Sequence, residues 1–314
     1  MRAASSRVGL AALLAVALAA AAAAQASRRA AVLEIAGAAA RSLVIVDGVR
    51  MGRTDEAGSR RIETLKPGRH AVEVRQTGFA VHKQQVALAA GRTVTVRPKR
   101  VAETDPATLA YQRAEELAAD GKNRDAVPVY REAIAARGGA YAEAGIGLAR
   151  ALLAVKSTDE ATAAIAAVLD AAPRNAEAHA VLANILRERG LAADAAAEYR
   201  KSIELAGGRA PEAHTGLAIL LDEGGEREQA VAAFRKAIEQ NNDAEPILYQ
   251  LLGATLEELD RPKEAIAAYE RFLALAPNHS LAAAVRSVLD RLREAQERPD
   301  EGDINPYAPK PPLR

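Results

Sequence analysis

The second half of the chain repeats itself. An alanine recurs every 34 or 35 residues, at Ala126, Ala161, Ala195, Ala230 and Ala265. Three further columns keep the same register. A small residue lies twelve positions before each alanine (Ala114, Ala149, Ala183, Ala218, Gly253), and a leucine lies nine positions before it (Leu117, Leu152, Leu186, Leu221, Leu256). A large side chain lies four positions after each alanine (Tyr130, Ile165, Tyr199, Phe234, Tyr269). Repeats of this length whose small residues allow close helix approach predict helical hairpins stacked in a solenoid.

These columns resemble the tetratricopeptide repeat family. The matching units are residues 107–140, 142–175, 176–209, 211–244 and 246–279. We therefore expect an all-α superhelical solenoid of five helical hairpins. Residues 280–297 have an amphipathic pattern (Leu281, Val285, Leu289) that predicts a capping helix, which such arrays need for solubility. The proline-rich tail, 298–314, is expected to be disordered.

The resemblance also implies a binding surface, because the first helices of this family line a concave face that holds extended peptides or partner helices. The positions carried over are Tyr111, Glu115, Ile146, Arg150, Asn184, Arg187, Thr215, Asp222, Gln250 and Glu257. Asn184, beside Arg150 and Arg187, is suited to hold a ligand carboxylate or backbone group. The alternative is that these residues are solvated on a face that binds nothing.

The first third of the chain has a different pattern. Residues 30–100 contain short runs of alternating apolar and polar residues, such as 70–75 and 93–97, separated by Gly-containing turns. This alternation predicts a small antiparallel β-sandwich, joined to the repeats by a linker at 101–106. Val44 to Gly52, Leu65 to Val74 and Gly78-Phe79 resemble the PEGA module, which implies a non-catalytic envelope accessory domain. The Pro-Glu-Gly-Ala stretch of that family is missing after Thr54.

The formal net charge of +1 hides an asymmetry between these two parts. Residues 27–100 carry a net charge of +9, whereas residues 101–314 carry −10. The basic residues can solvate the β module, dock on the acidic second part, or attract an anionic polymer such as a cell-wall glycan or peptidoglycan. Nucleic acid is not the expected partner of an exported protein in which Phe79 is the one aromatic residue of the module available for base stacking.

The N-terminus has the features of an export signal. Arg2 and Arg7 precede an uncharged, apolar stretch that ends at Ala24-Gln25-Ala26. This order predicts a signal peptide at residues 1–26, with cleavage near Ala26 and release to the periplasm or cell surface. An uncleaved membrane anchor is the alternative, although the stretch is short and rich in alanine for a span.

The sequence contains no recognisable catalytic or cofactor-binding motif. Cysteine is absent, which excludes Cys nucleophiles and Cys-based metal sites. His179 and His214 hold the same place in adjacent repeats, and the repeat itself accounts for both without a metal ion. We therefore expect no enzyme activity, cofactor or metal. The sequence predicts an adaptor of the bacterial cell envelope that binds another envelope protein; self-association is a further option, and the alternative is a polysaccharide-binding accessory protein.

Overall fold

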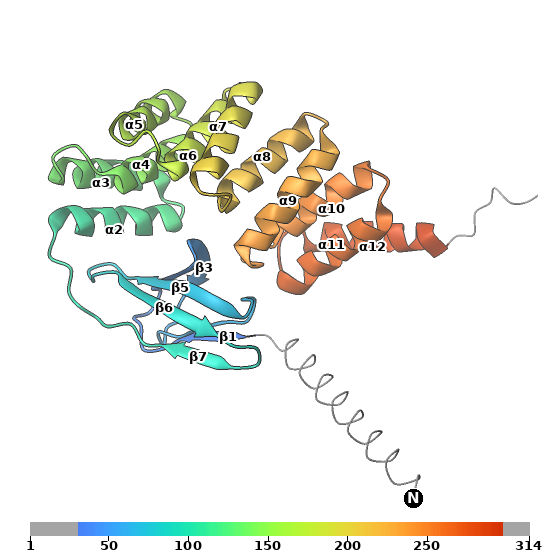
Figure 1. Cartoon of the computed structure of the whole chain (residues 1–314), viewed down its shortest axis with the longest axis horizontal. Coiled ribbons are helices and arrows are strands. Elements are labelled where there is room, and N and C mark those ends of the chain that lie inside the picture. The colour runs from blue at the N-terminus through green and yellow to red at the C-terminus, as the bar shows by residue number, and fades with distance from the viewer. Residues whose placement is uncertain (1–30, 298–314) are drawn as a thin grey trace, which may run out of the picture.

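The computed structural model describes residues 31–297 and shows a β-rich region followed by an array of helices (Figure 1). The signal peptide predicted at 1–26 and the tail at 298–314 lie outside the described residues. Within 31–297, no helix is both long enough and apolar enough to cross a membrane.

The β-rich region, called the β module below (residues 31–100), has two sheets. Its strands are β1 (Val32–Ile35), β2 (Leu43–Val46), β3 (Val49–Arg53), β4 (Arg60–Ile62), β5 (Gly68–Arg75), β6 (His82–Leu88) and β7 (Thr93–Val96). One sheet has the order β4-β1-β7 and the other β3-β2-β5-β6. The two sheets share one hydrophobic core, which buries Leu33 of β1, Val46 of β2 and Val72 of β5.

The expectation of a purely antiparallel sandwich is wrong at one strand pair. β1 and β7 are parallel, with Val32 opposite Thr93 and Ile35 opposite Val96. A parallel pair needs a long crossover between its strands. Here the crossover is nearly the whole module, because the chain passes through β4 and the four-stranded sheet before β7 returns beside β1. Alternating sequence runs identify the strands but not the direction in which distant strands pair.

Eleven helices follow in the described part of the chain. They are α2 (Pro106–Ala119), α3 (Asn123–Ala136), α4 (Ala142–Ala154), α5 (Thr158–Ala171), α6 (Ala176–Glu188), α7 (Ala192–Leu205), α8 (Pro211–Glu223), α9 (Arg227–Asn241), α10 (Ile247–Glu258), α11 (Pro262–Leu275) and α12 (Ala282–Glu297). Consecutive helices pack in pairs from α2–α3 to α10–α11, and α12 packs on α11. The recurring alanines, from Ala126 to Ala265, are fully buried between the paired helices.

Glycines on first helices receive the tyrosine rings of second helices. A Cβ at Gly147 would lie 2.4 Å from the Tyr130 ring, and one at Gly216 would lie 2.3 Å from the Tyr199 ring. Each pair joins neighbouring hairpins, so the tyrosine fills the space between repeats. No side chain larger than hydrogen fits at either position while the ring keeps its place.

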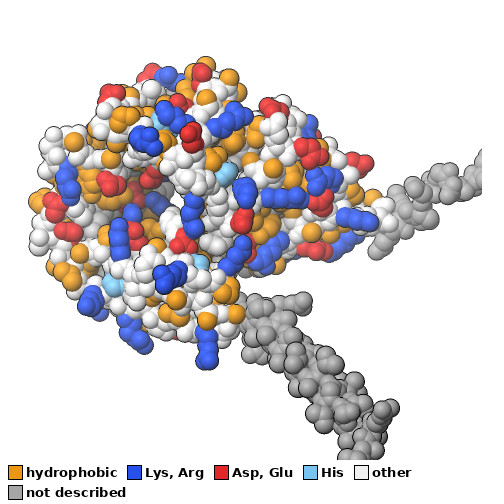
Figure 2. Space-filling view, viewed as in Figure 1, with side chains coloured by type: hydrophobic (Ala, Val, Ile, Leu, Met, Phe, Trp, Pro, Cys, Tyr) orange, Lys and Arg blue, Asp and Glu red, His pale blue; other side chains and the backbone are white. Residues whose placement is uncertain are grey.

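The array curves around the β module, which lies beside α2 and close to the C-terminal end of α9 (Figure 1). Figure 2 shows the module and the array enclosing a hollow, with charged side chains gathered around it. The segment between them stays in contact with the module, since Phe79 and Ala102 form an antiparallel bridge. Asp105 then caps α2 by accepting a hydrogen bond from the Thr108 amide at 3.0 Å. The first helix of the array, α2, therefore begins beside the module.

Candidate protein-interaction surface

The β module docks on the first helix of the array through ion pairs. Arg50 of β3 lies 2.9 Å from the carboxylate of Glu115, and Arg41 lies 2.8 Å from that of Asp120. The Thr77 hydroxyl donates to Glu116 at 2.9 Å. These contacts show that part of the positive charge of the module is used for docking on the acidic array, which is one of the three uses considered for it.

A buried glutamine completes this contact. Gln112 of α2 accepts a hydrogen bond from the Gly78 amide and donates one to the Phe79 carbonyl, both at 2.8 Å. Its side chain thus pairs with the turn between β5 and β6 as a backbone strand would. Because Gln112 is buried, loss of these two bonds would leave the Gly78 amide and the Phe79 carbonyl without these partners.

The module also contacts the array farther along the solenoid. Arg209, in the loop before α8, lies 3.4 Å from Asp47 in the β2–β3 turn, and Lys66 lies 3.8 Å from Glu239 of α9. Ala244 packs against the core of the module. The module thus contacts α2 at the start of the array and, farther along, Arg209 and α9. A space remains between the module and the helices that lie between these contacts.

One part of this space is a cavity of about 410 Å³, called the central cavity below. Its walls include Tyr111 and Glu115 of α2, Arg150 of α4 and residues of the β2–β3 turn. Glu115 is fixed from two sides, since it pairs with Arg50 and accepts a hydrogen bond from Tyr130 at 2.6 Å. Burial, with Glu115 next in importance, raises the pKa of Tyr130, so this hydroxyl stays protonated and donates.

Arg150 does not present a free charge to the cavity. Its guanidinium pairs with Glu177 of α6 at 2.7 Å and with Glu212 of α8. Burial lowers the pKa of Arg150, but the two carboxylates outweigh burial and hold the pKa above its usual value. The prediction placed Arg150 beside Asn184 at a site for a ligand carboxylate or backbone group, and in this geometry Glu177 and Glu212 already neutralise the charge of Arg150. Arg150 instead ties three successive hairpins together.

A second cavity of about 420 Å³, called the groove cavity below, adjoins Arg150 and contains Asn184, Arg187 and Thr215. Asn184 donates to Glu212 at 3.2 Å and accepts from the Tyr199 hydroxyl at 2.5 Å. Burial raises the pKa of Tyr199 to about 12. Among the described residues, the Arg187 Nε and the Thr215 Oγ1 are buried atoms without a hydrogen-bond partner.

The remaining predicted positions lie elsewhere. Ile146 is only 2% exposed and belongs to the core of the array, so its side chain offers no surface to a partner. Asp222, Gln250 and Glu257 do not line either cavity. Glu257 accepts a hydrogen bond from Tyr269 and pairs with Arg291 of α12 at 2.9 Å, which anchors the last helix.

The two histidines have a shared structural role. The Nε2 of His179 lies 3.0 Å from the Pro173 carbonyl, and that of His214 lies 3.2 Å from the Gly208 carbonyl. Each ring thus contacts the backbone six residues upstream, in the loop before its own helix. Both histidines therefore make the same backbone contact at the same position of their repeats, and this contact explains why a histidine occurs at each position.

Sequence reasoning missed the residues that the module and neighbouring repeats bring to the cavities. Arg50, Glu177, Arg209 and Glu212 line them but were not predicted. The opposite net charges of the two parts were the available signal for Arg50 and Arg209. No pattern within one repeat identifies Glu212, because its partner Arg150 is two hairpins away.

Comparison with known proteins agrees with the helical-repeat fold. Residues 117–185 match one family model described as a tetratricopeptide repeat, and residues 211–243 and 247–279 match another of the same description. The helical array is made of tetratricopeptide repeats. Proteins built from these repeats are generally protein-interaction scaffolds and are typically non-catalytic. A search of the curated proteins finds no match to this chain.

Solved structures show the same fold. The chain is similar to TTC0263, a thermophilic repeat protein of Thermus thermophilus, with 19% identity, a TM-score of 0.51, and coverage of 60% of this chain and 99% of that one. It is also similar to a chain of the APC/C hetero-tetramer Cut9-Hcn1, with 16% identity, a TM-score of 0.53, and coverage of 62% of this chain and 38% of that one. The present chain therefore spans well under half the length of the second relative.

Proposed function

We propose that this protein is a non-catalytic adaptor of the bacterial cell envelope, which binds a peptide or helix of another envelope protein in the concave face of its repeats. The fold supports an interaction role, since stacked hairpins offer a long curved contact surface. The β module, with its resemblance to the PEGA family, positions the array. The proposed export rests on the predicted signal peptide at residues 1–26.

The observation that carries this proposal is the groove cavity itself, because two residues of its wall, Arg187 and Thr215, each have a buried polar atom without a hydrogen-bond partner. Such an atom costs about 1–3 kcal/mol, and rotation of either side chain toward a bound segment would recover part of this free energy. The Arg187 guanidinium, which lies 3.6 Å from Glu223, can donate to a backbone carbonyl or carboxylate, and the Thr215 hydroxyl can donate or accept. Gly48 and Arg50 of the module line the same cavity, so a bound segment would contact both parts of the protein.

Site-specific photocrosslinking in intact cells tests the proposal. A photoreactive phenylalanine analogue replaces Ile219, an apolar, partly buried residue in the wall of the groove cavity, and in a control variant it replaces the exposed Arg200 of α7. We expect one envelope protein to crosslink from position 219 and not from position 200. The same products from both positions, or none from position 219, would contradict the proposal.

A second candidate function is the binding of an anionic cell-wall glycan or peptidoglycan through the β module. The observation that favours it is a group of arginines on the face of the module next to α2, where Arg53 has no carboxylate partner among the described residues. Co-sedimentation of the full-length protein with peptidoglycan tests it. Binding that falls steeply with added salt would support this function, and no binding at low salt would exclude it.

A further inference from the structure

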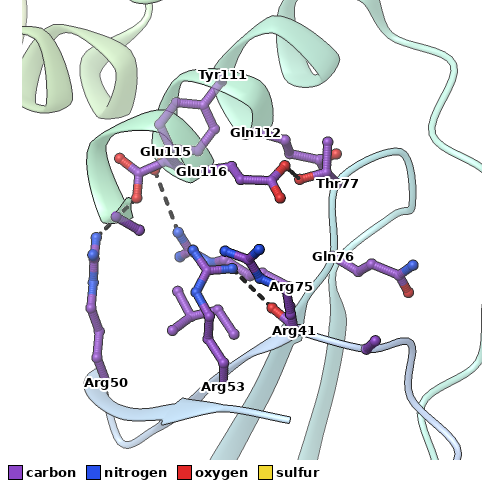
Figure 3. Close-up of a pocket in the computed structure, with 13 residues that line it drawn as sticks. Arg41, Arg50, Arg53, Arg75, Gln76, Thr77, Tyr111, Gln112, Glu115 and Glu116 are labelled. Carbon is purple, nitrogen blue, oxygen red and sulfur yellow. Dashed lines mark hydrogen bonds and ion pairs between the residues drawn. The ribbon is translucent and has the colours of Figure 1, made fainter. Parts of the chain in front are cut away.

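A small pocket of about 200 Å³ lies between the four-stranded sheet and α2 (Figure 3). Four arginines line it: Arg41, Arg50, Arg53 and Arg75. They come from the loop before β2, from β3 and from β5, and Figure 3 shows their side chains rising toward α2. The same pocket wall contains only two carboxylates, Glu115 and Glu116 of α2.

The two glutamates are already engaged. Glu115 pairs with Arg50 and accepts from Tyr130, while Glu116 accepts from Thr77 at 2.9 Å. Neither has an ion pair with Arg53 within the described residues. Arg53 is therefore the one arginine of the pocket whose guanidinium has no carboxylate partner in the part of the chain that the structure describes.

The other arginines differ in how firmly they are held. Arg75 pairs with Glu73 of its own strand, and Arg41 pairs with Asp120 at the end of α2. The guanidinium of Arg53 donates to the Arg41 carbonyl at 2.9 Å, which leaves its other N–H groups for a ligand. Arg41 and Arg50 are more than half exposed, with side-chain exposures of 54% and 56%.

This arrangement has the properties of an anion site. Guanidinium groups at close quarters repel one another unless a negative group lies between them. Their planar forks of N–H donors match the oxygens of phosphate, sulfate or carboxylate groups in a bidentate way. Exposed ion pairs are weak and are screened by salt, so Asp120 and Glu115 can be replaced by a stronger anion.

We propose that this pocket binds a phosphate, sulfate or carboxylate group of an anionic glycan, and that this group replaces Glu115 and Asp120 as the partner of the arginines. The proposal rests on the second candidate function above and assigns it a site. Because Arg41 and Arg50 also pair with Asp120 and Glu115, an anion that takes these two arginines competes with docking of the module on α2. A glycan on the module therefore weakens its contact with the array.

Fluorescence anisotropy with labelled heparin, a sulfated glycan, tests the site in the full-length protein at about 50 mM NaCl, where charge interactions are weakly screened. We expect Arg53→Ala to weaken binding about tenfold, the size of one charge-assisted contact. Arg92→Ala is the matched control, because Arg92 is an exposed arginine of the same module outside the pocket. It should change binding less than about twofold.

The outcomes separate the site from the function. Equal effects of the two variants would overturn the site and leave a diffuse basic surface, with glycan binding intact. No binding of heparin by the unmodified protein would overturn the site and the second candidate function together. If inorganic phosphate competes with heparin, the site is supported and its ligand is a single anionic group. If phosphate does not compete but heparin binding still depends on Arg53, the site is supported and its ligand is the polymer.

Energy transfer between two dyes tests the competition between binding and docking. The chain has no cysteine, so Gln85→Cys on β6 and Ala135→Cys on α3, both exposed, provide the only labelling positions. Saturating heparin should lower the transfer efficiency as the module leaves α2. Unchanged transfer at saturation would overturn the competition between binding and docking.

Discussion

Arg50 of β3 and Glu115 of α2 form a 2.9 Å ion pair at the boundary between the basic module and the acidic array. Both residues also line the central cavity, so docking and the shape of the inner surface depend on the same contact. The opposite net charges of the two parts thus meet in ion pairs such as this one. These ion pairs help to hold the module inside the curve of the repeats.

Reversal of this pair gives the first prediction. Arg50→Glu places two carboxylates together and should shift the module toward the undocked state, whereas the double variant Arg50→Glu with Glu115→Arg should restore docking. Because Arg50 is more than half exposed, we expect about 0–1 kcal/mol from the pair itself. Energy transfer between dyes at positions 85 and 135 measures the change, and equal transfer in the single and double variants would count against the ion pair.

Gln112 gives the second prediction. Gln112→Leu removes the acceptor for the Gly78 amide and the donor to the Phe79 carbonyl, at a cost of about 1–3 kcal/mol. Hydrogen exchange of the Gly78 amide should accelerate about tenfold or more. Arg113→Leu, at the exposed neighbouring position on α2, is the control and should leave this amide protected. Continued protection in Gln112→Leu would show that the turn does not depend on this side chain.

The close contact of Gly216 with Tyr199 gives the third prediction. In Gly216→Ala the new Cβ would lie 2.3 Å from the ring, so the side chain must move. We expect a destabilisation of about 1–3 kcal/mol from overpacking, offset by up to about 1 kcal/mol of helix propensity. Urea unfolding measures the difference. Gly224→Ala, whose nearest atom would be 3.3 Å away, is the control and should be much milder.

Asp105 gives a prediction about pH. A hydrogen bond from Thr108, with further help from Arg137, lowers the pKa of this carboxyl from 3.8 to about 2. A lowered pKa in the folded state means that the ionised group stabilises the fold above pH 4, and that this contribution disappears as the pH falls toward 2. Asp105→Asn should therefore be less stable than the unmodified protein at pH 7 and equal to it near pH 2. A difference that stays constant across this range would exclude the charge as its cause.

Much of the array could be predicted from the sequence because its signal is local and repeated. The alanine column, the leucines and the large residues at Tyr130 and Tyr199 recur within each repeat, and the matches to tetratricopeptide repeat models confirm the interpretation. The β-rich region was predicted from alternation alone. The parallel pairing of β1 with β7 was not, since it depends on a crossover of more than fifty residues.

The binding surface was less predictable. Ile146 lies in the core because the hairpins close over it, which a transferred repeat position does not reveal. Arg150 pairs with Glu212 across two hairpins, and this contact exists only because the solenoid curves. Docking of the module adds Arg50 and Gly48 to a surface that the repeat pattern assigns to the helices alone.

Calorimetric titration of the full-length protein with the partner captured from position 219 tests the central claim most directly. Arg187→Glu should weaken binding about tenfold or more, because it replaces a cation in the wall of the groove cavity with a carboxylate that repels the acceptor groups of a bound segment. Arg200→Glu, on the second helix of the same hairpin and outside both cavities, should bind as the unmodified protein does. Unchanged affinity in Arg187→Glu, or an equal loss in both variants, would contradict binding in the concave face.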